Sequence, residues 1–362
     1  MKAAALRGLI RKSQHGMALL LALTVITILI GVTVEAHRRV RNVMTKTAAS
    51  GERQRLNFLA SSGIQVGMAM LLKDKAAGET DSIQEDWARP EKRDELLAQL
   101  GVTPGSLTLE ITDLSGLIQV NALVVQPDGK DFVKAQAELW DRFLRPVVSL
   151  QETADLNLTT DIINCLKDWL DKNDDDALTG LNGAESDHYE GLDPSYKARN
   201  GPMRDVYELL MVKGMTPEIF YGTEKLPGIA PYLTAFGALT TGTGDSKTLE
   251  YPGHINISTA PLPVLKALLP VENADLAESL IAYREMKESE TYVNDVTQLT
   301  WYKNAPGCAD LAIDQSLVSV SSDLFEITAT GRSEAMITRV SAVVSREKDA
   351  EGNYSCRVLA WK

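Results

Sequence analysis

The chain has 362 residues, of which 44% are hydrophobic, so it can bury a substantial core, and its length suggests two globular units beside any anchor. The formal net charge is −12. Residues 1–50 carry eight Lys and Arg against Glu35 alone, a surplus of seven positive charges, so the rest of the chain carries −19. An acidic body repels phosphate groups, which argues against nucleic-acid binding.

The first predicted element is a membrane-spanning helix at residues 17–34. This run, MALLLALTVITILIGVTV, contains no charge and is just long enough to cross a bilayer. The basic residues before it predict that its amino-terminal end stays in the cytoplasm. A secretory signal would place a small-x-small cleavage site after the apolar region, whereas here the charged leader, residues 1–16, ends immediately before it. A plain signal anchor is the alternative interpretation.

A short basic leader that ends in Gly16 and continues into Met-Ala-Leu-Leu-Leu resembles the prepilin-type (class III) signal. The resemblance implies that prepilin peptidase cuts between Gly16 and Met17 and methylates the new amine. Most pilins have Glu at the fifth mature position, where this chain has Leu21. A carboxylate in hydrocarbon is costly unless it is paired, and its partner would be the terminal amine of a neighbouring subunit. Leu21 has no such amine to neutralise, which suits a subunit at a filament tip.

Within this class the sequence resembles the minor pseudopilin K family of type II secretion (general secretion pathway protein K) over nearly the whole chain. The strings that carry the resemblance, besides the leader and an acidic segment at 168–190, are ITDLSGLIQVNAL, YKARNGPMRDVYEL and INISTAPLPVL. The resemblance implies an α+β fold in which a long N-terminal helix packs on an antiparallel sheet. A large inserted all-α domain, similar to sterile-alpha-motif and helix-hairpin-helix units, would interrupt the sheet.

The same resemblance implies a function. The chain would be a single-pass protein of the bacterial inner membrane with its body in the periplasm. It would sit at the tip of the type II secretion pseudopilus and initiate or cap the filament that exports folded proteins across the outer membrane. The implied partners are the minor pseudopilins of types I and J, other pseudopilins, the inner-membrane assembly platform and prepilin peptidase.

The apolar spacing predicts that the membrane helix continues as a stalk, so that residues 17–75 form one unit. Residues 76–127 then begin the pilin-like body. Apolar residues alternate with polar ones from Leu107 to Ile111, and a turn at Ser115-Gly116 leads to a second run through Ile118, which predicts a β-hairpin. Spacings of three and four along the stalk involve Leu56, Leu59, Gly63, Val66 and Met70.

Helical sequence separates this region from strands near the carboxyl end. The inserted domain is expected at 128–306, and the C-terminal strands at 307–362. Five stretches of the insertion have helical spacing, namely 132–146, 161–172, 203–215, 261–269 and 274–287. Alternating patterns predict strands at 325–330, 336–344 and 354–361, the last two separated by a turn at 351–353.

Residues 168–190 are the strongest candidate for a ligand site. They carry eight Asp and Glu against one Lys, and so many carboxylates repel one another unless a cation neutralises them. The segment is not an EF-hand, because Asp176 stands where Gly is required and Asn182 where the closing Glu should be. A calcium ion, which prefers six to eight oxygen ligands, suits such a loop. The alternative is a solvated acidic loop at a helix end.

The patterns D-W-L-D-x-N and G-A-E-x-D-x-Y in this segment resemble the calcium-binding motif of the K family, which usually has Asp where this chain has Asn173. The substitution keeps an oxygen ligand and removes one charge, so a lower affinity is expected. The ligand set that the resemblance implies is Asp171, Asn173, Asp174, Asp176, Glu185 and Asp187.

The three cysteines have no C-x-x-C spacing, which argues against thiolate metal sites and thioredoxin-type chemistry. Cys165 lies in an apolar stretch and is predicted to be a core residue, which leaves Cys308 with Cys356 as the favoured pair for a bridge. The chain contains no G-x-S-x-G, H-E-x-x-H or P-loop motif, so we expect a structural subunit and not an enzyme.

Two functions from other classes are alternatives. A membrane-tethered DNA-uptake protein with helix-hairpin-helix units would need a basic loop around Gly214, where the chain offers Lys213 beside Glu208 and Glu218. A periplasmic hydrolase on a signal anchor would need a poised nucleophile, and no motif supplies one.

Overall fold

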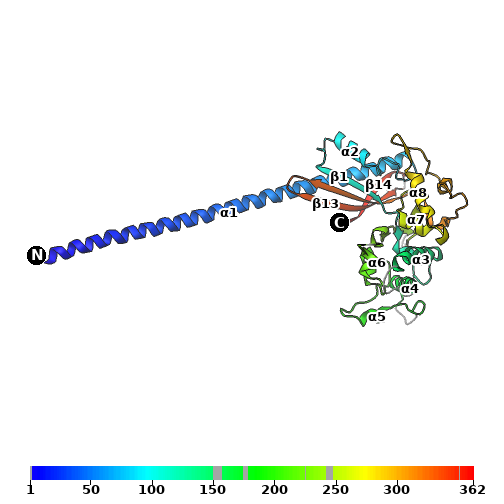
Figure 1. Ribbon diagram of the computed structural model, residues 1–362, viewed down its shortest axis with the longest axis horizontal. Helices are drawn as coiled ribbons and strands as arrows, with labels where there is room; N and C mark the ends of the chain where they lie inside the picture. The colour runs from blue at the N-terminus through cyan, green and yellow to red at the C-terminus, as the bar shows by residue number, and fades with distance from the viewer. Residues whose placement is uncertain (1, 150–156, 174–177, 225, 242–247, 350) are drawn as a thin grey trace.

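The computed structural model describes residues 2–149, 157–173, 178–224, 226–241, 248–349 and 351–362. Its first element is helix α1 (Lys2–Ala77), which projects from the body as a single rod (Figure 1). All residues from Gly16 to Ala48 are exposed. The segment Gly16–Ala77 is long and apolar enough to cross a membrane, and its 62 residues span about 93 Å at about 1.5 Å per residue. The predicted continuous stalk is confirmed.

The second half of α1 packs on a four-stranded antiparallel sheet in the order β1-β12-β13-β14. The strands are β1 (Leu107–Asp113), β12 (Leu324–Arg332), β13 (Ile337–Lys348) and β14 (Tyr354–Trp361). Helix α2 (Pro90–Gln99) covers the β1 edge, where the Arg93 side chain donates hydrogen bonds to the carbonyl oxygens of Leu109 and Trp87. We call this assembly the sheet unit. Its three C-terminal strands confirm the prediction from alternation.

Two glycines let α1 approach β12 closely. A Cβ at Gly63 would lie 2.9 Å from the Cβ of Ala329, and a Cβ at Gly67 would lie 2.8 Å from Cγ2 of Ile327. Both distances are shorter than side-chain contacts allow. Around this contact Ala60, Ile64 and other residues of α1 share a core with the apolar face of the sheet.

The predicted hairpin at 107–120 is wrong. Strand β1 pairs with β12, and the second run forms β2 (Ile118–Gln119), which pairs in parallel with β5 (Leu233–Thr234). The reason is burial: Ile118 and Val120 are fully buried in a second core, so neither residue lies on an exposed face. At the turn between the runs, a Cβ at Gly116 would lie 2.7 Å from Oγ1 of Thr259, so the chain is held against a distant segment.

The second core draws on residues from Ile118 to Val318 and defines what we call the inserted unit. It begins earlier and ends later than the predicted limits of 128 and 306, because the segments next to the sheet also contribute buried residues. Its α-helices are α3 (Lys134–Val148), α4 (Leu158–Leu170), α5 (Ser186–Glu190), α6 (Pro217–Tyr221), α7 (Leu262–Leu268) and α8 (Leu276–Glu285). Its 3₁₀ helices are η1 (Val120–Leu123), η2 (Val206–Met211), η3 (Ala230–Tyr232), η5 (Val271–Asn273), η6 (Trp301–Asn304) and η7 (Gln315–Leu317).

The inserted unit was expected to be all-α, but it is mainly helical and also contains short strand pairs. Besides β2 and β5 it contains β3 (Gly222–Thr223) with β4 (Leu226–Pro227), β6 (Leu239–Thr241) with β7 (Thr248–Glu250), β8 (Ile255–Asn256) with β11 (Val318–Ser319), and β9 (Lys287–Glu288) with β10 (Thr291–Tyr292). The predicted helix at 203–215 is replaced by the short 3₁₀ helix η2. These pairs are too short to show an alternating pattern in the sequence.

Buried polar side chains join the two units. The Asn256 side chain donates to the carbonyl oxygen of Asp81, to Asp113 Oδ2 and to Ser322 Oγ. Arg346 is buried in the sheet unit and bonds Asp81 Oδ1 and the carbonyl oxygen of Ser322. Because all five of these side chains are buried and come from both units, the two units are fixed to one another.

The predicted bridge between Cys308 and Cys356 is wrong, because all three cysteines are free thiols. Cys308 is buried in the core of the inserted unit, whereas Cys356 lies on β14 and donates a weak hydrogen bond to the carbonyl oxygen of Met68 on α1. The two residues therefore belong to different cores. Cys165 is a buried core residue, as predicted.

The glycine contacts predict a selective loss of stability. We expect Gly67→Val to destabilise the full chain by about 1–3 kcal/mol, because the added methyl groups collide with Ile327 and overpack the core. The measurement is the midpoint of thermal unfolding followed by circular dichroism. Gly51→Val is the matched control, since a Cβ there meets nothing within 4 Å. Equal midpoints for the two variants would contradict the predicted close approach.

The buried carboxyls of the sheet unit predict a pH dependence. Burial raises the pKa of Asp74 and of Asp113 to about 6 and that of Glu85 to about 7. These values lie above those of the unfolded chain, so the folded state binds more protons in this range, and stability rises as the pH falls through about 7 and 6. We expect a higher unfolding midpoint at pH 5.5 than at pH 7.5.

The variant Glu85→Gln isolates one contribution, since it removes the charge and keeps an oxygen that can accept from Ser82 and Trp87. The rise between pH 7.5 and 5.5, measured at constant ionic strength, should be smaller in the variant than in the parent chain. An identical rise in both proteins would show that Glu85 does not contribute.

Candidate functional site

The carboxyl end of α4 places two acidic side chains inside the protein. One face of this amphipathic helix, with Ile162, Leu166 and Trp169, is buried in the core. Asp168 lies in the last turn and Asp171 caps the helix, and both are almost completely buried. Residues three apart lie on the same side of a helix, so the two carboxylates point to the same region.

The chain then returns to this point at the start of α5. Glu185 is the N-cap residue of α5 and is also buried. One carboxylate oxygen from each of Asp168, Asp171 and Glu185 lies within 4.8 Å of the others. We call these three residues the carboxylate cluster.

The loop between the helices is shaped around Asp168. Its carboxylate accepts hydrogen bonds from the backbone N–H groups of Thr179, at 3.2 Å, and Ala184, at 2.9 Å. A Cβ at Gly183 would lie 2.2 Å from Asp168 Oδ2, so only glycine fits there. Gly129, at φ +74°, brings a second loop against Asp171, whose Cα would be 2.5 Å from a Cβ at that position.

Aromatic rings support the helix that carries the cluster. The rings of Trp169 and Tyr189 meet edge to face with centroids 5.1 Å apart, and Tyr189 stacks on Tyr196 at 5.3 Å. The Tyr189 hydroxyl accepts a hydrogen bond from the backbone N–H of Lys213. These contacts pack α4, α5 and the segment before α6 together, which fixes the positions of the acidic side chains.

The carboxylate cluster has more negative than positive charge. Lys167 Nζ lies 3.5 Å from Asp171 Oδ2 and bonds Thr179 Oγ1. Burial raises the pKa of Asp171 to about 6, against the opposing effect of Lys167. In the described part of the chain, Asp171 Oδ1 is buried and accepts no hydrogen bond. A set of carboxylate oxygens with a spare acceptor is chemically suited to a hard cation such as calcium.

The structure brings together only some of the predicted ligands. Asp171 and Glu185 are in the carboxylate cluster, and the half-buried Asn173 follows Asp171 and bonds it through its backbone N–H. Asp187 is exposed on α5, outside the cluster. Asp174 and Asp176 lie outside the described residues.

Asp168 was missing from the predicted ligand set. Its signal was present in the string D-W-L-D, because a spacing of three places both acids on one side of α4, next to the buried Trp169. An acidic residue in the apolar half of a helix is unusual unless it is paired or binds a cation.

The processing residues lie far from the carboxylate cluster. Gly16, Met17 and Leu21 are exposed on the free half of α1, and a Cβ at Gly16 would meet nothing within 4 Å. In the described structure these residues contact no other element, so their surroundings would be lipid or another subunit.

Comparisons with known proteins agree with this architecture. Residues 116–236 match the family model described as type II secretion system (T2SS), protein K. Type II secretion system protein K of Klebsiella pneumoniae is 25% identical over 269 residues, which cover 72% of this chain and 71% of the relative. The Pseudomonas aeruginosa protein of the same name is 25% identical over 326 residues, 87% of this chain and 85% of the relative.

A solved structure shares the fold. A chain from the crystal structure of the GspK-GspI-GspJ complex of the enterotoxigenic Escherichia coli type 2 secretion system superposes with a TM-score of 0.58. The match has 15% sequence identity and covers 88% of this chain and 98% of the other. The predicted α+β class, with a long N-terminal helix on an antiparallel sheet, is confirmed.

The fold is pilin-like, and its one apolar N-terminal helix is long and apolar enough to serve as a single-pass membrane anchor. These matches confirm the predicted resemblance to type II secretion system protein K, a minor pseudopilin of a protein transport system.

Proposed function

We propose that this chain forms the tip of the type II secretion pseudopilus and initiates or caps the filament that exports folded proteins across the outer membrane. The observation that carries the proposal is the position of the inserted unit. It lies at the end of α1 that is farthest from the amino terminus, beyond the sheet (Figure 1). A subunit stacked on this end would collide with it.

The amino-terminal electrostatics support the same position. In a stacked filament, a carboxylate at the fifth mature position would pair with the terminal amine of a neighbouring subunit, since an unpaired charge in hydrocarbon is costly. Leu21 offers no carboxylate. A tip subunit needs none, because no amine from a subunit beyond it has to be neutralised.

The partners follow from this position. The similar solved chain comes from a complex with GspI and GspJ, so minor pseudopilins of types I and J are the proposed neighbours, followed by the other pseudopilins. Before assembly, residues 17–34 would anchor the chain in the bacterial inner membrane, with the body in the periplasm and the assembly platform as a further partner. The basic residues of the leader favour this orientation.

Processing is the most direct test of the class of subunit. In cells with active prepilin peptidase, we expect the intact mass of the membrane-extracted protein to match a chain that starts at N-methylated Met17. Gly16→Ile should block cleavage because a bulky side chain would occupy the cleavage position, whereas Gly8→Ile in the leader is the matched control and should still be cleaved. An uncleaved parent chain would contradict the proposal and favour a plain signal anchor.

We also propose that the carboxylate cluster, Asp168, Asp171 and Glu185, binds calcium. The three carboxylates and the spare acceptor of Asp171 fit an oxygen-ligand cation. The ion would supply positive charge that offsets the repulsion between buried carboxylates. It would also link the end of α4 to the start of α5, while the backbone bonds to Asp168 hold the loop in position. Asn173, Asp174, Asp176 and Asp187 remain predicted additional ligands.

Calcium should therefore stabilise the full chain. At about 100 times the dissociation constant, calcium is expected to add about 2.7 kcal/mol to the free energy of unfolding, and extracellular sites of this kind bind at about 10⁻⁴–10⁻³ M. The measurement is the thermal midpoint as calcium is added and then removed with a chelator. Asp171→Asn should abolish most of the shift, whereas Glu218→Gln, at an exposed position of α6, should keep it. A midpoint that does not respond to calcium would refute the site.

A further inference from the structure

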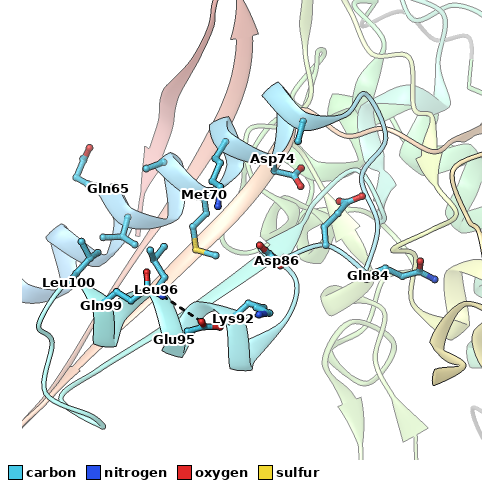
Figure 2. A pocket seen from close by; sticks show the side chains of 15 residues that line it. Gln65, Met70, Asp74, Gln84, Asp86, Lys92, Glu95, Leu96, Gln99 and Leu100 are labelled. Atoms are coloured by element: carbon cyan, nitrogen blue, oxygen red, sulfur yellow. Dashed lines mark hydrogen bonds and ion pairs between the residues drawn. The ribbon is translucent and has the colours of Figure 1, made fainter. Parts of the chain in front are cut away.

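A groove of about 810 Å³ lies between α1 and α2 on the sheet unit (Figure 2). It is far from the carboxylate cluster in the chain and includes none of its residues. Its size is within the range of pockets that bind ligands, about 300–1,000 Å³. The groove is a second concave surface that the proposed tip position does not use.

Both walls of the groove are helix faces. On α1, Val66, Met70 and Asp74 recur at a spacing of four, beside a second row that includes Ala69 and Lys73. On α2 and its C-cap, the lining residues follow spacings of three and four: Lys92, Glu95, Leu96, Gln99 and the C-cap Leu100. The other side of α2, with Arg93 and Leu97, is buried toward β1. Each helix thus presents a row of side chains that a third helix could pack between.

The apolar surface in the groove is open to solvent. Leu100, at the mouth, is 58% exposed, and Val66 and Leu96 are half-buried. Met70 lies at the floor (Figure 2), where it belongs to the core between α1 and the sheet. An apolar strip of this kind, flanked by charged side chains, is typical of a groove that receives the apolar face of a helix.

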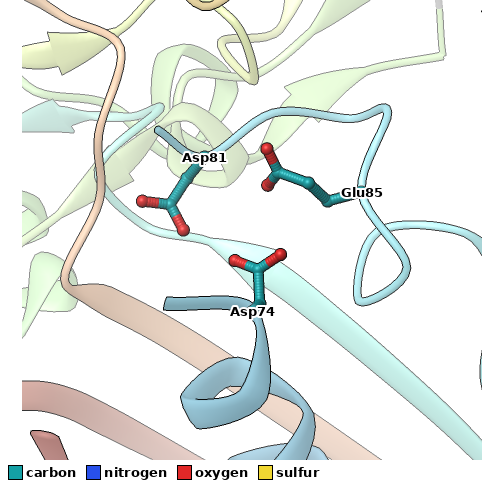
Figure 3. A group of neighbouring side chains, drawn as sticks. All are labelled: Asp74, Asp81 and Glu85. Carbon is teal, nitrogen blue, oxygen red and sulfur yellow. The ribbon is translucent and has the colours of Figure 1, made fainter. Parts of the chain in front are cut away.

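One end of the groove is acidic. The carboxyl groups of Asp74, Asp81 and Glu85 converge there, with oxygens within 4.8 Å of one another (Figure 3). Asp74 and Glu85 line the groove directly, as does Asp86. On the α2 wall of the groove, Lys92 pairs with Glu95 at 3.1 Å, so the charge of Lys92 is compensated.

Two cations already lie behind these carboxylates, but they do not balance them. Arg346 bonds Asp81 and lies 3.6 Å from Asp74, and Lys75 lies 3.9 Å from Asp81. Among the described residues, Asp74 Oδ2 is a buried oxygen that accepts no hydrogen bond. Burial also raises the pKa of Asp74 and of Glu85, and for Asp74 the nearby Arg346 and Lys75 offset this effect only in part.

We infer that this groove binds an amphipathic helix of another polypeptide, whose apolar face lies along α1 and α2 and whose Lys or Arg reaches the acidic end at Asp74 and Glu85. Charge complementarity favours this occupant. An apolar helix without a cation would cover the carboxylates without pairing them, and burying an unpaired charge costs free energy. A bare metal ion is disfavoured, since the guanidinium of Arg346 already bonds Asp81. The inference goes beyond the tip position and does not depend on it.

The test is photo-crosslinking of the full chain in cells that assemble the secretion system. Benzoylphenylalanine replaces Gln99, in the groove, or the adjacent Ala98, which is exposed on α2 but outside the groove. We expect an adduct at Gln99 and little or none at Ala98. Mass spectrometry should map the adduct to a segment with apolar residues at spacings of three and four and a Lys or Arg.

A charged substitution in the groove tests whether the apolar contact contributes to binding of the helix. Leu100→Glu, combined with the probe at Gln99, should lower the adduct yield about tenfold, because a charge on the apolar contact disfavours docking. Since Leu100 is largely exposed, the thermal midpoint of this variant should equal that of the parent chain. The inference is overturned by equal yields at the two probe positions, by no adduct at Gln99, by a mapped segment without a basic residue, or by yields that Leu100→Glu does not change.

Discussion

The close contact between α1 and β12 is the constraint on which the rest of this molecule depends. A rod of this length has one environment at residues 16–48, which are all exposed, and another over its second half, where it packs on the sheet. Gly63 and Gly67 remove the side chains that would separate the helix from Ala329 and Ile327. The helix therefore joins the sheet rigidly, and an anchor at one end can position the body at the other.

The same contact organises the electrostatics at the far end of α1. There the helix brings Asp74 and Lys75 to Asp81 and Arg346, and the polar contacts of Asn256 continue into the inserted unit. Burial of so many ionisable groups costs free energy unless each has partners. The arrangement fixes the inserted unit beyond the end of the sheet, which is the geometry that supports a terminal position in the filament.

Two groups of carboxylates in this protein have different surroundings and therefore different proposed roles. In the carboxylate cluster, Asp168 is held by backbone N–H groups, and three carboxylates lie near Lys167, so a small cation fits. At the end of the groove, Arg346 already bonds the buried Asp81, whereas Asp74 and Glu85 line the groove beside a solvent-open apolar strip. The second arrangement suits a charged side chain carried by a partner.

The sequence by itself determined the features that depend on neighbouring residues. Local periodicity accounts for the spacing along α1, the alternation in β12, β13 and β14, and the amphipathic pattern of α4. The uncharged run after Gly16 is likewise visible in the sequence. The leader, the acidic segment and the three quoted strings carried the resemblance to the K family. Only the tertiary structure decided which distant segments meet. In the folded chain, β1 pairs with β12, Cys308 and Cys356 lie in different cores, and Asp168 lies next to Glu185. The tertiary structure also opened the groove between α1 and α2. These contacts depend on burial and on packing across long stretches of chain, which a periodic pattern does not encode.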